Sequence, residues 1–385
     1  MDREKVAYCA VNRIFGFRPT LGLHMIEYAG GAAALFDADK EKLRMAAGDY
    51  GIHVYELNSL ALEQAEKELE RTERDGARFV TIADADYPAM LRECCDDPPL
   101  GLYVKGISST DEIFASRPAV AIVGTRDMSM YGKEWTKRIV ECLAGAETKP
   151  LIISGLAYGI DITAHRAALE AGLPTVAVMA TGIDSIYPCR HSVMAERIAW
   201  TPGCALITDY PEGTMPMAPH FLRRNRIIAG LSIAVILVES RVKGGGMMTA
   251  RLAYSYNRDV YAVPGRLEDA RSQGCNFLIR EKTAEAIFSP EDLVKELGLG
   301  APGGRGRRKR ELASVARQKY GESGGGFGAD EVASVARAVE CGDRPDAAAV
   351  ARTTGLPYGT VSGILEMFLY DGLVDMDLLG HCSPA

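Results

Sequence analysis

PHFLRRNRIIAGLSIAVILVESRVKGGGMMTA, residues 219–250, is the stretch around which this chain of 385 residues is organised. A cluster of arginines precedes an apolar run, Ile233–Val238, which three glycines follow after a short gap. From His220 to Arg251 there are six cationic side chains and one carboxylate, Glu239, so the net charge is 6 − 1 = +5 in a chain whose net charge is −7. A buried strand, a glycine-rich turn and a helix together present backbone N–H groups and the positive end of the helix dipole. The stretch therefore predicts a phosphate-binding surface, although an arginine-capped helix with a tight turn explains it equally well.

The composition of the whole chain is that of an ordinary globular protein, with 47% apolar residues, 25% charged residues and a pI near 5.6. This acidity argues against a general basic coat for nucleic acid, so any polyanion site must be a local patch. The nine cysteines form no CxxC pair and show no metal-like spacing with the six histidines. We therefore expect reduced thiols, no bound metal and a cytoplasmic location. No apolar run approaches the roughly 18 residues that a membrane span needs, and no apolar signal core is present at the N-terminus.

Continuous apolar runs alternate with helix-like segments through the middle of the chain. This alternation predicts an α/β fold with a parallel sheet that is covered on both faces. Ligands of such sheets bind beyond the carboxyl ends of the strands. The predicted strands are Ala119–Val123, Leu151–Ser154, Thr175–Ala180, Cys204–Thr208, Ile233–Val238 and Val260–Val263.

Glycines and polar residues follow four of these strands. A tight turn is enough to explain any one of these glycines, but several of them at one sheet edge predict a shared crevice. Asp161 is expected to cap the next helix rather than to act in catalysis. Neither a GxGxxG motif with a later acid nor a GxxxxGK[ST] motif is present, so we expect no nucleotide cofactor. The strand-end residues are Gly124, Thr125 and Arg126, then Ser154, Gly155, Gly159 and Asp161, then Thr181, Gly182 and Asp184, and finally Lys243, Gly245 and Thr249.

The sequence on either side of the predicted sheet indicates two further domains and a linker. Residues 1–74 predict a small helical domain that contains the strong helix former Leu57–Arg74. Within it, FGFRPTLGL (15–23) also fits one hairpin of a helix-hairpin-helix module, which contacts DNA backbones. Residues 298–329 are rich in Gly and Arg, with five cations in Arg305–Arg310, and predict a linker. Residues 330–385 follow the order of a winged helix, but the segment Tyr358–Tyr370 has no Arg or Lys, so we expect it to contact protein rather than the major groove.

Six motifs, followed by VPG, occur in an order that resembles the DNA-processing protein A (DprA/Smf) family over roughly residues 80–295. The resemblance implies an extended Rossmann-like domain over 78–297, a SAM-like or helix-hairpin-helix-like domain over 1–74 and a winged-helix-like domain over 330–385. It also implies a protein without enzymatic activity that binds and protects single-stranded DNA, forms a homodimer and helps load the RecA recombinase in natural transformation and recombination. The motifs are YPAMLRECCDDPPLGLYVKG, AIVGTRDMSMYG, ISGLAYGIDITAHRAAL, TGIDSIYP, RRNRIIAGLS and GGGMMTA.

The resemblance further implies which residues bind DNA. A cationic track beside an aromatic surface binds single strands without reading their sequence. Arg126 and Arg226 are expected to contact one strand, and replacing either is expected to weaken binding while leaving the fold intact. Tyr158 and Tyr187 fit either as further stacking residues or as turn residues. The residues implied are Arg126, the backbone amides of Gly155, Ala157 and Gly159, the triplet Arg224, Asn225 and Arg226, and the aromatic Phe221.

The chain departs from the family pattern at three places near Phe221 and the glycine turn. Leu222 stands where proline is usual, Met217 and Ala218 stand where a basic residue is frequent, and GGM replaces GSL. Two other functions remain open. A Rossmann-type nucleoside monophosphate hydrolase carries PGGxGTxxE, whereas the comparable turn here has Arg251 and no acid after Thr249. A scaffold with a vestigial site would show no salt-dependent affinity for oligonucleotides.

Overall fold

The computed structural model describes residues 2–114, 117–300, 312, 316, 319–320, 327–341, 345–371, 373–376 and 381–384. The chain divides into two compact units, Met1–Pro302 and Gly303–Ala385, and each is described by itself. The cationic run Arg305–Arg310 of the predicted linker lies outside the described residues. Within the described ranges, no helix combines the length and the apolar character that crossing a bilayer requires.

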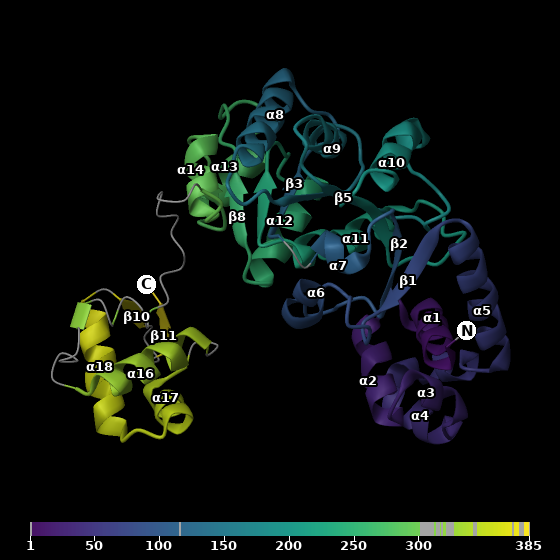
Figure 1. Ribbon diagram of the computed structural model, residues 1–385, viewed down its shortest axis with the longest axis horizontal. Coiled ribbons are helices and arrows are strands. Elements are labelled where there is room, and N and C mark those ends of the chain that lie inside the picture. The colour runs from purple at the N-terminus through teal and green to yellow at the C-terminus, as the bar shows by residue number, and fades with distance from the viewer. Residues whose placement is uncertain are drawn as a thin grey trace. The chain divides into compact units, whose positions relative to one another are not determined.

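The first unit begins with a group of helices (Figure 1). Several begin at a capping side chain, because Asp2, Asp39 and Asn58 accept backbone N–H groups of the turn that follows each of them. Their apolar side chains share one buried cluster with Phe79 and Leu206 of the sheet, so the helices pack directly against it. They are α1 (Arg3–Phe15), α2 (Pro19–Ala29), α3 (Ala32–Asp37), α4 (Lys40–Ala47), the 3-10 helix η1 (Gly48–Glu56) and α5 (Ser59–Arg74).

Among the described residues, nine strands form one sheet in the order β1-β2-β6-β5-β4-β3-β7-β8-β9. All pairs from β6 to β9 are parallel, whereas β1 and β2 extend the sheet in antiparallel fashion beyond β6. The α/β prediction is confirmed, and every predicted strand lies within two residues of an observed one. The strands are β1 (Ala77–Thr81), β2 (Gly101–Lys105), β3 (Ala119–Val123), β4 (Leu151–Ser154), β5 (Thr175–Val178), β6 (Ala205–Thr208), β7 (Ala234–Leu237), β8 (Asp259–Ala262) and β9 (Glu285–Ala286).

Helices cover both faces of the sheet. One face packs against α6 (Ala89–Cys94), α11 (Ala218–Leu231), α12 (Gly245–Ser255) and α13 (Gln273–Arg280). The other packs against α8 (Met130–Ala144), α9 (Ile160–Glu170) and α14 (Pro290–Glu296). The remaining helices of this part are α7 (Thr110–Phe114), η2 (Cys189–His191) and α10 (Ser192–Ala199).

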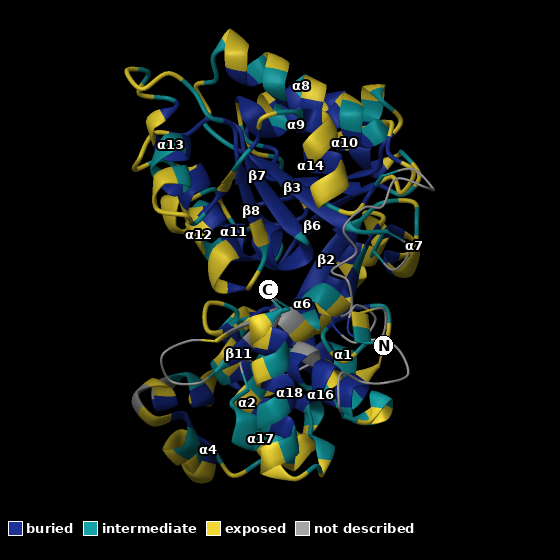
Figure 2. Cartoon of the chain, turned by 90° about the vertical axis from the view of Figure 1, so that its left-hand side faces the viewer, coloured by how far each residue is buried: buried dark blue, intermediate teal, exposed yellow. Residues whose placement is uncertain are grey.

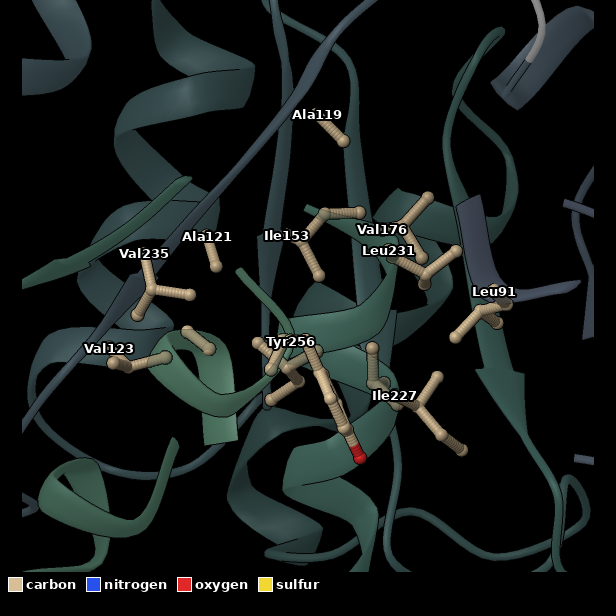
Figure 3. Packing of buried hydrophobic residues seen from close by; sticks show 14 of the residues in the cluster. Leu91, Ala119, Ala121, Val123, Ile153, Val176, Ile227, Leu231, Val235 and Tyr256 are labelled. Carbon is tan, nitrogen blue, oxygen red and sulfur yellow. The ribbon is translucent and has the colours of Figure 1, made fainter. Parts of the chain in front are cut away.

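Strand β3 shows how the sequence produces these two layers. Successive side chains of a strand point to opposite faces, so Ala121 and Val123 join the cluster under α11 and α12 while Val120 and Ile122 join the cluster under α8 and α9. Figure 3 shows the first set in the same buried cluster as Ile227 and Leu231 of α11. In Figure 2 the central strands are buried between helices whose outer surfaces are exposed. Burial on both faces is the reason for the continuous apolar runs in the sequence.

In the described part of the second unit, helices over Ala329–Cys341, Ala347–Thr354 and Tyr358–Tyr370 precede an antiparallel hairpin, where the sequence predicts one short strand after the last helix. Gly355 ends the second helix in the left-handed conformation, and Pro357 directly precedes the third. Val350, Ile364 and Phe368 lie in its buried cluster. The elements are α16 (Ala329–Cys341), α17 (Ala347–Thr354), α18 (Tyr358–Tyr370), β10 (Val374–Met376) and β11 (Cys382–Pro384).

Candidate nucleic-acid interface

The loop after β3 is fixed to the ends of two neighbouring elements. The N–H of Thr125 donates to the carbonyl of Glu239, which follows β7, at 2.7 Å. The carbonyl of Thr125 accepts the N–H of Ile160, at the start of α9, at 3.2 Å. Strands β3 and β7 are adjacent although the chain visits β4, β5 and β6 between them, so this is the point at which the strand order reverses. Ligands of open α/β sheets bind at such a point.

Gly159 allows the loops after β3 and β4 to approach each other. Its φ of +77° is a conformation that side chains disfavour, and a Cβ there would lie 2.2 Å from the carbonyl oxygen of Thr125. Gly246 plays a similar part in α12, where a Cβ would lie 3.3 Å from the Cα of Gly124. The predicted convergence of Gly124, Gly159 and the glycine turn at one sheet edge is therefore present in the structure.

Arg126 leaves this loop with an exposed side chain. Its guanidinium carbon lies 4.8 Å from the ring centroid of Phe221, in the first turn of α11, and the ring of exposed Tyr187 lies 5.4 Å from that of Phe221. Within the part of the chain that the structure describes, no carboxylate lies at ion-pair distance from Arg126. An unpaired guanidinium stacked on an aromatic ring beside a second ring combines a phosphate donor with a base-stacking surface.

Arg226 has the opposite environment. It is 2% exposed, and its Nη2 lies 2.6 Å from Oδ2 of Asp209, which follows β6. The same guanidinium donates to the carbonyl of Asp97, in the connection between α6 and β2. This placement differs from the expectation that Arg226 contacts phosphate, because its charge is paired in the interior. It also differs from the expectation that the loss of Arg226 leaves the fold intact, because the side chain joins three segments of the chain.

Arg224 is also buried, on another side of α11. It donates to the carbonyls of Gly155, at 2.7 Å, and of Val178. Burial lowers the pKa of Arg224 to about 10, although the nearby carboxylate of Asp161 opposes that change. Asp161 accepts the N–H of Gly155 at 3.2 Å instead of capping α9, so the expected capping role is replaced by a bond to the loop that precedes the helix. Burial raises the pKa of Asp161, and Arg224 counters it.

The other predicted residues divide into buried and exposed groups. Ser154 is fully buried and donates to the carbonyl of Ile122, while Asn225 and Thr249 are also buried. Ala157 is half-buried, and its backbone hydrogen bond lowers the pKa of Asp161, as that of Gly155 does. Lys243 and Gly245 are exposed at the start of α12, where no side chain caps the helix N-terminus. An uncapped N-terminus beside a lysine attracts anions.

Two features of the site do not follow from the sequence reasoning above. Asp209 is missing from the predicted residues, although it directly follows β6 and the rule that drew attention to other strand ends applies to it equally. Tyr187 fits two roles by sequence, and only its exposure beside Phe221 favours stacking over a turn role. The departures Met217, Ala218 and Leu222 are all exposed around Phe221, so an apolar rim occupies a place where a basic residue is frequent. No group of three or more His, Cys, Asp or Glu side chains in the described part of the chain is arranged to hold a metal ion.

Comparison with known proteins gives one family and several relatives. The model of the family described as DNA recombination-mediator protein A matches residues 78–298, more than half of the chain. The Smf protein of Synechocystis sp. is 39% identical over 230 residues, which is 60% of this chain and 56% of that protein. The chain thus spans little more than half the length of that relative.

Solved structures similar to this one include two DNA processing proteins A. DNA processing protein A from Streptococcus pneumoniae matches with a TM-score of 0.64 and 29% identity, over 77% of this chain and 98% of that chain. The protein of the same name from Helicobacter pylori matches with a TM-score of 0.50 and 31% identity, over 57% and 95%. The Helicobacter pylori structure was described for its single-stranded DNA binding mode.

Proposed function

Because the chain belongs to the DNA recombination-mediator protein A family, we propose that it binds single-stranded DNA at the carboxyl edge of its sheet and takes part in DNA processing during natural transformation and recombination. The observation that carries the proposal is exposed Arg126, stacked on Phe221 beside Tyr187 and without an ion-pair partner among the described residues. The single-stranded DNA binding mode described for the Helicobacter pylori protein supports the choice of ligand.

The chemistry of these side chains suits a single strand better than a duplex. Ring faces such as those of Phe221 and Tyr187 stack on any unpaired base, and each stacked base contributes about 1–3 kcal/mol. The Arg126 guanidinium donates to a phosphate oxygen in a charge-assisted hydrogen bond worth about 1.5–3 kcal/mol. In a duplex the bases are already stacked and paired, so the aromatic contribution is lost.

The structural roles of Arg224, Arg226, Ser154 and Asp161 divide the predicted site into a contact surface and a support. In the proposal, Arg126, Phe221 and Lys243 contact the strand, while the buried residues hold the loops that present them. The amide of Gly155 faces Asp161 and belongs to the support. Gly159 remains a proposed backbone contact, because it lies where the two loops meet.

A hydrolase needs a carboxylate or another general base at the reacting bond. The carboxylates at this edge have structural partners: Asp161 binds the Gly155 amide, Glu239 accepts the N–H of Ser129 at 2.9 Å, and Asp184 accepts the N–H of Gly213 at 3.1 Å. These bonds favour binding over hydrolysis of a nucleoside monophosphate.

Three further parts of the proposal rest on family membership. They are a homodimer, a contact with RecA that helps load it onto the bound strand, and the division into domains over 1–74, 78–297 and 330–385. Light scattering of the full chain at micromolar concentration tests the first, and a monomer would contradict it. RecA filament assembly on single strands, with and without the protein, tests the second.

The central experiment is a titration of labelled single-stranded and blunt duplex oligonucleotides over a range of salt concentrations. We expect tighter binding to the single strand and a slope of log affinity against log salt of about −0.7 for each neutralised phosphate. Equal affinity for the two forms, or a flat salt response, would overturn the proposed function.

A further inference from the structure

The turn between α1 and α2 carries an exposed aromatic residue that the proposed interface does not include. Phe17 is 59% exposed, yet surrounding side chains hold its ring in place. The ring centroid lies 5.5 Å from that of His220 and 6.0 Å from that of Tyr210, and the guanidinium carbon of Arg223 lies 4.8 Å from it. Arg223 also donates to the carbonyl of Gly16, which fixes the turn to α11.

This arrangement repeats the geometry at Arg126 and Phe221. In both places a guanidinium carbon lies 4.8 Å from the centroid of a phenylalanine ring. The two places adjoin, because His220, which packs against Phe17, is the residue directly before Phe221 in the first turn of α11. Phe17 therefore packs, through buried His220, against the same helical turn that carries Phe221.

Positive charge continues along the same path. Arg223 lies 3.5 Å from Asp209, which also binds Arg226 at 2.6 Å, and Arg226 has a second carboxylate, Asp97, at 3.6 Å. Beyond Phe17, Arg18 is exposed and lies 3.7 Å from the ring centroid of Tyr50. No carboxylate of the described residues lies at ion-pair distance from Arg18. The exposed guanidinium of Arg18 therefore adds a positive charge beside Phe17, which a phosphate group would complement.

We propose that Phe17, with Arg18 and Arg223, forms a second stacking position for the same single strand, so that the groove runs from Phe221 across the start of α11 onto the α1–α2 turn. The inference rests on the proposed function, because the ligand is the same strand. The proposal assigns to the turn FGFR (15–18) a contact with DNA bases through an aromatic ring. A helix-hairpin-helix turn would instead contact the DNA backbone through its amides. A solely structural role would leave unexplained why Phe17 as a residue is more than half exposed, since burial stabilises in proportion to the apolar area removed from water.

The test compares two exposed aromatics of the helical region in the full chain. Tyr28, on α2, is 54% exposed and serves as the matched control for Phe17. With a labelled oligothymidylate of about 20 nucleotides, we expect Phe17→Ala to weaken binding about fivefold or more and Tyr28→Ala to leave it unchanged. Melting temperatures of both variants, measured on the same preparations, should match that of the unmodified chain.

A second variant reports stacking directly. In Phe17→Trp, a base stacked on the indole should quench its emission when the strand is added, beyond any change from Trp135 and Trp200 in the unmodified chain. If Arg126→Ala weakens binding but Phe17→Ala behaves like Tyr28→Ala and the new indole is not quenched, this inference is overturned while the proposed function stands. If the unmodified chain does not bind single strands at all, the proposed function fails and the inference fails with it.

Discussion

Arg126 and Arg226 are expected from the sequence to contact the same strand, and the structure gives them opposite surroundings. Arg126 is exposed, stacked on Phe221 and without a carboxylate partner among the described residues. Arg226 is buried and bonded to Asp209 and to the carbonyl of Asp97. The first has a charge available to a ligand, and the second has a charge already used to join α11 to the segments after β6 and α6.

The difference shows that two arginines expected at one site can lie in opposite surroundings, one exposed and one buried. An unpaired cation at the surface attracts a polyanion, because its field is not cancelled by a neighbour. A buried cation must be paired, because an uncompensated charge in the interior costs several kcal/mol. We therefore expect the same residue type to contribute to affinity in one place and to stability in the other, and substitutions separate the two contributions.

The largest effect is expected on stability. Arg226→Ala leaves Asp209 buried with a weaker partner and should lower the free energy of unfolding by about 3–5 kcal/mol. Denaturant titration of the full chain measures this change. In the double variant Arg226→Met, Asp209→Leu, the decrease in the free energy of unfolding should be smaller than the sum of the decreases in the two single variants. The reason is that no unpaired charge remains at those two positions. Normal unfolding of Arg226→Ala, together with loss of DNA affinity, would place Arg226 in the contact surface after all.

The next effect is expected on affinity alone. Arg126→Ala should weaken single-strand binding by about 1.5–3 kcal/mol, roughly tenfold or more, and leave unfolding unchanged. Arg138 provides the matched control, since it is also exposed and lies 4.8 Å from the ring centroid of Trp135 on α8. Arg138→Ala should not alter the affinity measured by anisotropy titration. Equal losses from the two substitutions would mean that any surface arginine serves, and the specific site would be rejected.

A smaller effect measures the contact between Arg126 and Phe221. Stacked cation–ring pairs at exposed sites contribute about 0.5–1 kcal/mol. A double-mutant cycle with Arg126→Ala and Phe221→Ala should give a coupling of that size in the binding free energy and none in the unfolding free energy. Strict additivity in binding would show that the two side chains contact the strand independently.

The smallest effect is expected from removing the winged-helix-like segment. Its helix α18 carries no Arg or Lys, so removing residues 330–385 should leave single-strand affinity nearly unchanged. The comparison is between the full chain and residues 1–329, which keep the cationic run Arg305–Arg310, in the same titration. A loss greater than about tenfold, or 1.4 kcal/mol, would show that the second unit contributes to the DNA site.

The sequence by itself determined the layers of the fold and the edge at which a ligand would bind. Continuous apolar runs located the strands β3 to β8, because strands covered on both faces contain apolar residues at every position. The glycines after those strands indicated a common crevice, because only a residue without Cβ tolerates the close approach seen at Gly159 and Gly246. These properties depend on neighbouring residues in the chain and can therefore be derived from local patterns.

Only the tertiary structure decided which arginines are exposed and which are buried. Within one helix, Arg223 and Arg226 point toward Asp209 whereas Arg224 points toward Gly155, and what each direction meets depends on segments far away in the chain. The partner of Arg224 is Gly155, 69 positions away, and Arg226 reaches Asp97, 129 positions away. The energy of a guanidinium group depends on burial and on a paired carboxylate, and both are properties of the surroundings rather than of the residue. For that reason the RRNR sequence identified the helix, but the sheet and its loops determined that Arg224 and Arg226 stabilise the interior and that Arg126 stays exposed at the surface.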